Sequence, residues 1–535
     1  MYLLHIEETE DTGCPFIELR LYVDDIPPYA ILSHRWGSPD DEPTFRDLLL
    51  QTPSGTLKKG YRKIVSCCVQ ALEYGLSHAW IDTCCIDKSS SAELSEAINS
   101  MYSWYEASRI CFAYMEDVPP NDNVFRRNSY FRQSTWFKRG WTLQELIAPD
   151  EVIFFDSQWS MRTLGSKSTL SEIISSETGI PQNILNNKNM LHSASVEQKM
   201  SWASLRQTTR VEDEAYSLMG LFGVNMPTVY GEGKKAFRRL QEAIMKASPD
   251  HTIFAWRAAE DDMYDGMLAT SPRPFQQCGQ FESLTYIEFI ERFNIIGANL
   301  KPYYFMTNYG LQIHLPIVAL SPHFEGFYFA FLAAHDVHED TSIIIFLKKR
   351  TDGPAEHFTR VRFNGQTLIS RPMPDGGYLD FAPATKLLIS GNKHSETNFL
   401  SAPETKRFPV SFARFSIALT KHTDVIFNVQ HSTSSEFAAN ESSNIHITPL
   451  RPAETLELTV LTQGRHVSAL LRSSNTRHPL NDVTVSVAFG LHEGEPWAFV
   501  DAFREPKKDF RVSVDIETET ETLLVTSDLF SGTSD

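Results

Sequence analysis

The sequence predicts a doubly wound α/β domain with a mainly parallel sheet and added helices, followed by a β-rich, sandwich-like C-terminal domain. Between residues 29 and 156, short apolar runs alternate with segments of helical periodicity, which is the pattern of repeated βαβ units. Beyond Trp256 the pattern changes to short β-type runs separated by Gly, Pro, Asn and Asp. A chain of 535 residues is also long enough for two or three domains.

The first domain is expected to span residues 1–256, with an α/β core at about 29–156 and a helical extension at about 199–247. Right-handed crossovers between successive strands make such a core sheet parallel. Four core strands are expected, at 29–33, 79–82, 110–115 and 152–155. Three intervening helices are expected, at 61–75, after Ser90, and from near Ser134 to just before Pro149.

The helix after Ser90 has the clearest sequence signal. Ser90 and Glu93 have the spacing of a capping box, in which each side chain bonds the other residue's backbone N–H. The apolar positions that follow recur at helical spacing, at Leu94, Ala97, Ile98, Met101 and Tyr105.

The second domain is expected at residues 301–535, after a transition at 257–300, and its ligand cannot be read from the sequence. Strands are expected at 310–315, 327–333, 342–347, 410–419, 456–461, 483–489 and 510–514. No repeat of fixed period accompanies them, so the sequence does not favour a propeller.

Polar side chains follow the first two core strands. Ser33, Arg35 and Trp36 come at the end of the first strand, and the loop 83–87 follows the second. In doubly wound sheets, ligands bind beyond the carboxyl ends of the strands. Both loops are therefore expected on one rim, around a cleft for a small molecule.

Composition excludes several classes of function. The net charge of −18 argues against a general attraction to nucleic acid or to anionic lipid. The seven cysteines show no CxxC spacing, which predicts neither a disulfide framework nor a zinc site, and a cytoplasmic location fits best. The acidic start of the chain is unlike a signal peptide, and no apolar run reaches the roughly 20 residues of a membrane span.

Three blocks of the core resemble the hallmarks of the fungal heterokaryon incompatibility (HET) domain. They read YAILSHRWG at 29–37, WIDTCCIDK at 80–88 and RGWTLQEL at 139–146, and RVEDEAYSLMG at 210–220 and YGEG at 230–233 look like their continuation. The resemblance covers roughly residues 1–256. It implies a role in self/nonself recognition, a fungal form of innate immunity in which the domain is an effector of programmed cell death after incompatible hyphae fuse.

HET domains are also thought to be remote relatives of TIR domains, which implies a TIR/flavodoxin-like core. The segment WTLQEL at 141–146 is similar to the TIR segment whose glutamate is catalytic in TIR domains that cleave NAD. The resemblance therefore implies that Glu145 is catalytic and that NAD is the substrate. A carboxylate beside the ribose can stabilise the oxocarbenium-like state through which nicotinamide leaves. No other cofactor and no metal is expected.

Residues of the predicted rim supply the expected substrate contacts. Arg35 can pair with pyrophosphate, Trp36 can stack on a ring, and Asp82 can hold a ribose hydroxyl. The further binding candidates are Ser33, Cys84, Asp87 and, on the same helical face as Glu145, Trp141. Structural alternatives stay open: Arg35 and Asp82 can pair with each other, and the tryptophans can serve in packing.

Two other hypotheses for function stay open. The α/β domain can be a non-catalytic, TIR-like module that signals by self-association, with the β-rich domain recognising an unidentified protein partner. A weaker hypothesis is a hydrolase with Cys84 as nucleophile and His34 as base.

Two further motifs have simpler interpretations. Gly231, Gly233 and Ala236 fit a GxGxxA dinucleotide pattern, but Pro227 precedes them and no strand does, so the start of a helix is favoured. A basic cluster is interpreted as a solvated loop or as a positive lip for an anionic dinucleotide rather than as a DNA-binding surface. Its members are Arg126, Arg127, Arg132, Lys138 and Arg139.

Overall fold

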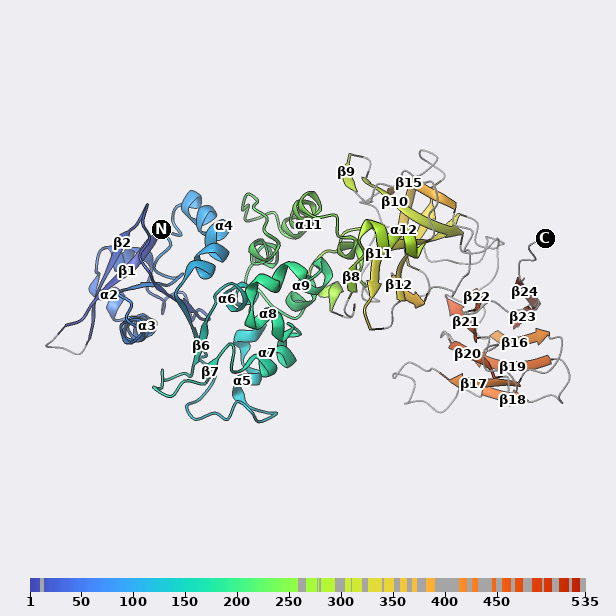
Figure 1. Ribbon diagram of the computed structural model, residues 1–535, viewed down its shortest axis with the longest axis horizontal. Helices are drawn as coiled ribbons and strands as arrows, with labels where there is room; N and C mark the ends of the chain where they lie inside the picture. Colours follow the sequence, from blue (N-terminus) through green and yellow to red (C-terminus); the bar gives the residue numbers. More distant parts are fainter. Residues whose placement is uncertain are drawn as a thin grey trace. The chain divides into compact units, whose positions relative to one another are not determined.

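The computed structural model describes two compact units (Figure 1). Unit 1 comprises Met1–Ala259, Met267–Leu284 and Pro302–Gln312, and unit 2 comprises Glu260–Gly266, Thr285–Lys301 and Ile313–Asp535. The residues described are 1–9, 14–257, 266–276, 278, 281–293, 304–308, 310–319, 326–338, 341–350, 357–362 and 368–372. Ten further strands are described by their backbones, at 382–389, 413–420, 426–431, 445–448, 455–462, 467–474, 484–492, 495–502, 510–518 and 522–529.

Unit 1 contains a seven-stranded sheet with the order β2-β1-β4-β3-β5-β6-β7. The strands are β1 (Tyr2–Glu7), β2 (Phe16–Leu21), β3 (Ala30–Ser33), β4 (His78–Trp80), β5 (Ile110–Tyr114), β6 (Val152–Phe155) and β7 (Gly165–Ser166). The four predicted core strands are β3, β4, β5 and β6. They are parallel to one another, whereas β1 is antiparallel to β2 and β4, and β7 is antiparallel to β6.

The prediction of a mixed α/β fold is confirmed, but "mainly parallel" describes only the four central strands. Strands β3 and β6 are buried along their whole length, and β5 along all but its last residue, as expected where a parallel strand is covered on both faces. The strands β1 and β2 were not predicted. They alternate apolar and polar residues, and they add an antiparallel extension beside β4.

The strand order changes direction at β3, which determines where a cleft can form. After β3 the chain forms β4 on one side of it and then crosses to form β5 on the other side. A crevice therefore opens beyond the carboxyl ends of β3 and β5, the usual ligand position in doubly wound sheets. Ser33 is the last residue of β3.

Helices α3 (Tyr61–Glu73) and α4 (Ser91–Ala107) confirm two of the predicted crossover helices. Gly75 follows α3 with φ of 73°, a left-handed conformation that ends the helix at low cost for glycine. Ser90 caps α4 by accepting from the backbone N–H of Glu93. The capping box is incomplete, because the Glu93 carboxylate accepts from the backbone N–H of Asp87 instead, at 3.0 Å.

The helix predicted from Ser134 to Pro149 was wrong as a single element. The chain forms a 3₁₀ helix at Thr135–Lys138, becomes extended at Arg139, and resumes as α6 (Thr142–Ile147). Gly140 lies at the break, where its N–H donates to the carbonyl of Gln207 at 2.8 Å. A Cβ at Gly140 would lie 2.5 Å from Cγ2 of Thr208, so the close approach of this second segment requires glycine.

The predicted helical extension is confirmed as several helices rather than one long run. Short helices complete unit 1, and α11 carries a strongly amphipathic sequence whose apolar side is buried. The remaining helices of the unit are α1 (Phe45–Leu49), α2 (Pro53–Thr56), α5 (Tyr130–Gln133), α7 (Ser171–Thr178), α8 (Gln182–Asn186), α9 (Val196–Ala203), α10 (Asp213–Tyr216) and α11 (Lys235–Ala247).

The described chain from residue 281 onward is β-rich, as predicted, and α12 (Tyr286–Arg292) is the α-helix described there. Each of the seven predicted strands overlaps an observed one, although residues 410–412 and 483 lie outside the described part. An eight-stranded sheet comprises β8 (Phe281–Ser283), β10 (Gly310–Ala319), β11 (Phe327–Asp336), β12 (Thr341–Lys349), β13 (His357–Val361), β14 (Leu368–Pro372) and β15 (Ala382–Ile389), with β9 (Phe305–Thr307) paired to β10.

Two smaller antiparallel sheets follow. Strand β22 of the four-stranded sheet contacts β23 and β24 of the five-stranded sheet, as in sheet-on-sheet packing. The five-stranded sheet comprises β16 (Ala413–Thr420), β18 (Ile445–Thr448), β19 (Thr455–Thr462), β23 (Phe510–Thr518) and β24 (Thr522–Leu529). The four-stranded sheet comprises β17 (Ile426–His431), β20 (Val467–Ser474), β21 (Thr484–His492) and β22 (Glu495–Ala502).

The domain boundaries at 256 and 301 stay predictions, because contacts within one chain do not show which part folds alone. Among the described residues, no helix is both long and apolar enough to span a bilayer.

Candidate functional site

A buried pair formed by Ser33 and Glu145 lies at the carboxyl end of β3. The Ser33 hydroxyl donates to Oε2 of Glu145, and the indole Nε1 of Trp136 donates to the Ser33 oxygen at 2.9 Å. Ser33 is fully buried, and Glu145 is 3% exposed. Strand β3 and helix α6 thus bring together two predicted site residues that lie 112 positions apart in the sequence.

Burial makes the Glu145 carboxyl a much weaker acid than usual. Desolvation raises its pKa from 4.5 to about 7, with the negative charge of Asp82 acting in the same direction. The charges of Arg139 and Arg206 and the hydrogen bond from Ser33 act in the opposite direction. Near neutral pH the carboxyl therefore populates both its neutral and its ionised form.

Both ends of α6 are fixed by buried cations. At its start, the Arg206 guanidinium donates to the Arg139 carbonyl and to the Thr142 hydroxyl, each at 3.0 Å. At its end, Lys167 donates to the carbonyls of Leu146 and Pro149. Lys167 complements the helix dipole at the carboxyl-terminal end, and the hydrogen bonds from Arg206 fix the start, so α6 holds Glu145 in a defined position.

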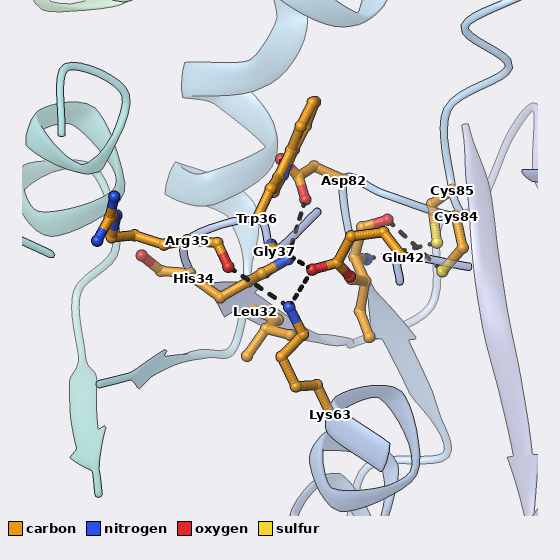
Figure 2. Close-up of polar contacts among 12 residues, drawn as sticks. Leu32, His34, Arg35, Trp36, Gly37, Glu42, Lys63, Asp82, Cys84 and Cys85 are labelled. Carbon is orange, nitrogen blue, oxygen red and sulfur yellow. Dashed lines mark hydrogen bonds and ion pairs between the residues drawn. The ribbon is translucent and has the colours of Figure 1, made fainter. Parts of the chain in front are cut away.

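The rim includes His34, Trp36 and Asp82, which Figure 2 shows close together. Trp36 is 45% exposed, and its Nε1 donates to Oδ2 of Asp82 at 2.8 Å. Nε2 of His34 lies 3.8 Å from Oδ1 of Asp82, and among the described residues neither His34 nitrogen nor Oδ1 has a hydrogen-bond partner. Burial, together with nearby positive charges, holds the pKa of His34 well below its usual value, so the ring is neutral. Buried polar atoms usually have hydrogen-bond partners, so these three atoms are exceptions within the described part of the chain.

Cations surround the rim. The Lys88 ammonium lies 3.7 Å from the centre of the Trp36 ring, and the Arg139 guanidinium lies 5.3 Å from it. Arg139 also donates to the His34 carbonyl at 2.5 Å. Lys63 bonds the Arg35 carbonyl at 3.4 Å and pairs with Glu42. Such a cluster favours an anionic ligand even on a chain of negative net charge.

The salt bridge considered between Arg35 and Asp82 does not form. Arg35 is exposed and donates to the Thr135 hydroxyl at 2.6 Å, while Asp82 accepts from Trp36. The guanidinium of Arg35 therefore lies on the open side of the rim, where it can meet a ligand.

Three further predicted residues have partners within the protein, and these are Cys84, Asp87 and Trp141. Cys84 is fully buried, its thiol donates to the Ile81 carbonyl at 3.8 Å, and burial raises its pKa well above the usual value, which argues against a thiolate nucleophile. Asp87 accepts from the N–H and hydroxyl of Ser89, as in an Asx turn. The Trp141 side chain hydrogen-bonds Asp213 of α10, and burial raises the pKa of that carboxyl although the bonds from Tyr230 and Trp141 act in the opposite direction.

The GxGxxA pattern does not hold a phosphate in this structure. Gly231 and Gly233, both with positive φ, donate their N–H groups to Oε1 of Glu212 at 2.8 and 3.0 Å. The chain thus supplies its own carboxylate where a dinucleotide site would need free donors. This agrees with the interpretation as the start of a helix, here α11.

Sequence reasoning missed the residues that complete the site. Trp136 and Arg206 were not predicted as site residues, His34 was considered only as a partner of Cys84, and Arg139 was interpreted as part of a solvated loop or of a positive lip for an anionic dinucleotide. Arg139 carried a usable signal, because it opens the block that contains Glu145. Trp136 and Arg206 act through contacts between distant segments, which spacing does not reveal. Within the described residues, no group of three or more His, Cys, Asp or Glu side chains is arranged to bind a metal.

Comparison with known proteins identifies the family of the segment that carries most of this site. Residues 29–129 match the family described as Heterokaryon incompatibility protein (HET). The chain carries a HET domain. The resemblance is thereby confirmed for the blocks at 29–37 and 80–88, and β3, β4 and β5, with His34, Trp36 and Asp82, lie inside the match, whereas the block at 139–146 with Glu145 lies outside it.

Part of this chain is also similar to a curated protein. Vegetative incompatibility protein HET-E-1 of Podospora anserina is 46% identical over 226 residues, which cover 41% of this chain and 16% of that protein. The chain therefore matches only about a sixth of the length of that relative. Residues 235–266 match a second family, described as Domain of unknown function (DUF8212), which begins with α11. No solved structure gives a significant match.

Proposed function

We propose that this protein is an effector of heterokaryon incompatibility and programmed cell death, and that it hydrolyses NAD at the bond between nicotinamide and ribose. The incompatibility role is supported by the HET-family match and by the relative named as a vegetative incompatibility protein. The proposed chemistry rests on one observation: the Glu145 carboxyl meets Ser33 at the carboxyl end of β3, beside the strand at which the sheet order reverses.

The strand order supports the TIR-like part of the proposal. The parallel strands follow the order β4-β3-β5-β6, in which the first strand lies between the second and the third. Flavodoxin-like sheets have this order and bind their ligands beside the first strand. Glu145 lies at this place, so a substrate in the crevice would have its reacting bond near the carboxyl.

The main requirement of the reaction is that the protein holds a negative charge beside the ribose. The bond from the ribose anomeric carbon to nicotinamide breaks, and its electron pair leaves with nicotinamide, which departs as a neutral ring. Water then adds to the ribosyl cation and releases one proton. Ionised Glu145 stabilises the cation by its charge and by bonds to ribose hydroxyls, and Ser33 holds the carboxyl in place.

The rim supplies binding groups for the rest of the dinucleotide. Arg35 and Lys63 can pair with pyrophosphate, and the exposed Trp36 ring can stack on a base. Because Glu145 is 3% exposed, the substrate must displace part of the rim before it reaches the carboxyl. The contacts of Trp36 with Lys88 and Arg139 are the ones that a stacked ring would replace.

The test is nicotinamide release from NAD by the purified full-length protein at high concentration, with Glu145→Gln as the variant. The amide keeps the size of the side chain and can still accept from Ser33, but it carries no charge. We expect loss of at least about a hundredfold in turnover. Glu172→Gln, an exposed change in the first turn of α7, serves as the control and should leave turnover unchanged.

Expression in a fungal host separates the two classes of function. If cell death and NAD loss both disappear with Glu145→Gln, the enzymatic proposal is supported. If that variant kills cells as the wild type does while NAD stays constant, the non-catalytic signalling hypothesis replaces it.

A further inference from the structure

The outer strand of the unit 1 sheet has a free edge. Strand β2 pairs with β1 on one side, and within the described part of the chain no strand pairs with its other side (Figure 1). Phe16 and Leu21, at the two ends of β2, are 43% and 56% exposed. Exposed sheet edges present unpaired N–H and C=O groups that can pair with another strand.

The hydrogen-bond pattern shows which backbone groups point outward. Met1 and Tyr22 exchange both bonds, with N–O distances of 2.6 and 2.9 Å. Hydrogen-bonded pairs alternate with non-hydrogen-bonded pairs along antiparallel strands. The backbone groups of Arg20, Glu18 and Phe16 therefore also bond to β1. The register agrees, since Leu3 lies opposite Arg20 and His5 opposite Glu18. The N–H and C=O groups of the other residues therefore face outward; these residues are Ile17, Leu19 and Leu21.

The charges on β2 select one register for pairing with an identical strand. In a twofold arrangement centred on Leu19, Glu18 lies opposite Arg20 of the second copy, and Ile17 lies opposite Leu21. Centring on Glu18 or on Arg20 instead would place like charges directly opposite each other, which is unfavourable. Only the Leu19-centred register pairs all three outward-facing residues and also matches opposite charges.

We propose that β2 is a self-association surface, on which a second copy of this chain pairs antiparallel about a twofold axis at Leu19. Leu19 exchanges two hydrogen bonds with Leu19 of the other copy, and each Ile17 exchanges two with the opposite Leu21. The exposed Leu21 side chain then packs beside Ile17 of the second copy, and the two sheets become one continuous sheet. This proposal rests on the sheet edge alone, so it does not depend on the chemistry of Glu145.

Disulfide trapping tests the register directly, in full-length protein carrying Cys14→Ser to remove the exposed native thiol. Glu18→Cys and Arg20→Cys are made as separate proteins and mixed under mild oxidation. The two positions form a pair without mutual hydrogen bonds, with Cα atoms about 4.5 Å apart, which a disulfide can bridge. The mixture should yield a covalent dimer joining one copy of each variant. Either protein alone should form several-fold less, because its two cysteines are offset along the strands.

A charge-reversal cycle measured by sedimentation gives an independent readout. Glu18→Arg and Arg20→Glu should each weaken self-association by roughly tenfold, since each places like charges opposite twice. The double variant restores opposite charges and should recover the wild-type association. Circular dichroism and melting curves establish that each variant is folded. A wild type that stays monomeric at every concentration, or cross-links that form equally in the unmixed proteins, would overturn the proposal.

Discussion

Two buried glutamates of unit 1 have opposite electrostatic environments. Glu145, beside β3, receives a hydrogen bond from the Ser33 hydroxyl, and burial raises its pKa to about 7. Glu212 receives the N–H groups of Gly231 and Gly233, and backbone hydrogen bonds lower its pKa below 4.5. Their exposed fractions are similar, at 3% and 7%.

The difference shows that burial alone does not identify a reactive carboxyl. Glu212 lies among backbone donors that stabilise its charge, so its ionised form is part of the fold. Glu145 lies where its negative charge is poorly compensated, so ionisation of Glu145 destabilises the folded protein. A carboxyl of the second kind is the better candidate for chemistry, because a substrate cation could supply the missing compensation.

The largest expected effect is on the pH dependence of stability. Because the folded state raises the pKa of Glu145 from 4.5 to about 7, the folded protein binds this proton more tightly than the unfolded chain does. The Glu145 carboxyl therefore stabilises the folded state below pH 4.5. This contribution, about 3 kcal/mol in total, is lost as the pH rises to about 7. Glu145→Gln should be more stable than the wild type by about this amount above pH 7, as measured by urea unfolding.

Glu212→Gln should have the opposite sign and serves as the matched comparison. Its wild-type carboxyl stabilises the fold above the unfolded pKa and loses that contribution as pH falls. The gain in free energy of unfolding of Glu145→Gln over the wild type should be larger at pH 8 than at pH 4.5. If the gain were the same at both pH values, the assignment of Glu145 as an uncompensated carboxyl would be wrong.

The second-largest effect is the loss of stability expected when Glu212 is replaced. Glu212→Ala leaves the N–H groups of Gly231 and Gly233 without their acceptor and should lower the free energy of unfolding by about 1–3 kcal/mol. Glu242→Ala breaks an exposed ion pair with Arg238 in α11 and should cost below about 1 kcal/mol. If Glu212→Ala and Glu242→Ala lowered the free energy of unfolding equally in urea, Glu212 would not have the structural role described for it.

The smallest effect concerns the proposed activity. Ser33→Ala removes a hydrogen bond that favours the ionised form of Glu145, so the pKa of the carboxyl should rise further. The acid limb of the pH–rate profile for NAD hydrolysis should move to higher pH, with turnover at pH 6 falling by roughly tenfold and turnover at pH 9 changing less. Ser54→Ala, on the exposed helix α2, is the control. A uniform loss at all pH values would indicate a role for Ser33 other than setting this pKa.

Much of the α/β core could be predicted from local patterns. The apolar runs of β3, β5 and β6 and the periodicity of α3 and α4 are properties of contiguous residues, and parallel topology then brings their ends to one rim. That reasoning placed Ser33 and Asp82 correctly on the same rim. The strand β1 was missed because the start of the chain was considered only as evidence against a signal peptide, and no element was assigned to the residues of β2.

The parts that could not be predicted depend on contacts between distant segments. The break at Gly140 is caused by residues 207 and 208, and nothing near Gly140 in the sequence records their approach. The electrostatic state of Glu145 likewise depends on Arg206 and Asp82, which lie far from it in the chain. Sequence blocks indicated which glutamate to examine, whereas its environment required the structure.

The close packing at Gly140 limits how small a working fragment can be. The carbonyl of Lys138 accepts from the N–H of Gln207 at 2.7 Å, and Arg206 holds the start of α6, so residues beyond position 200 complete the surroundings of Glu145. A fragment ending at residue 160 would contain every strand beside the glutamate and still lack the segment that orients it. Dissection of this protein should therefore begin from pieces that keep residues 206–208.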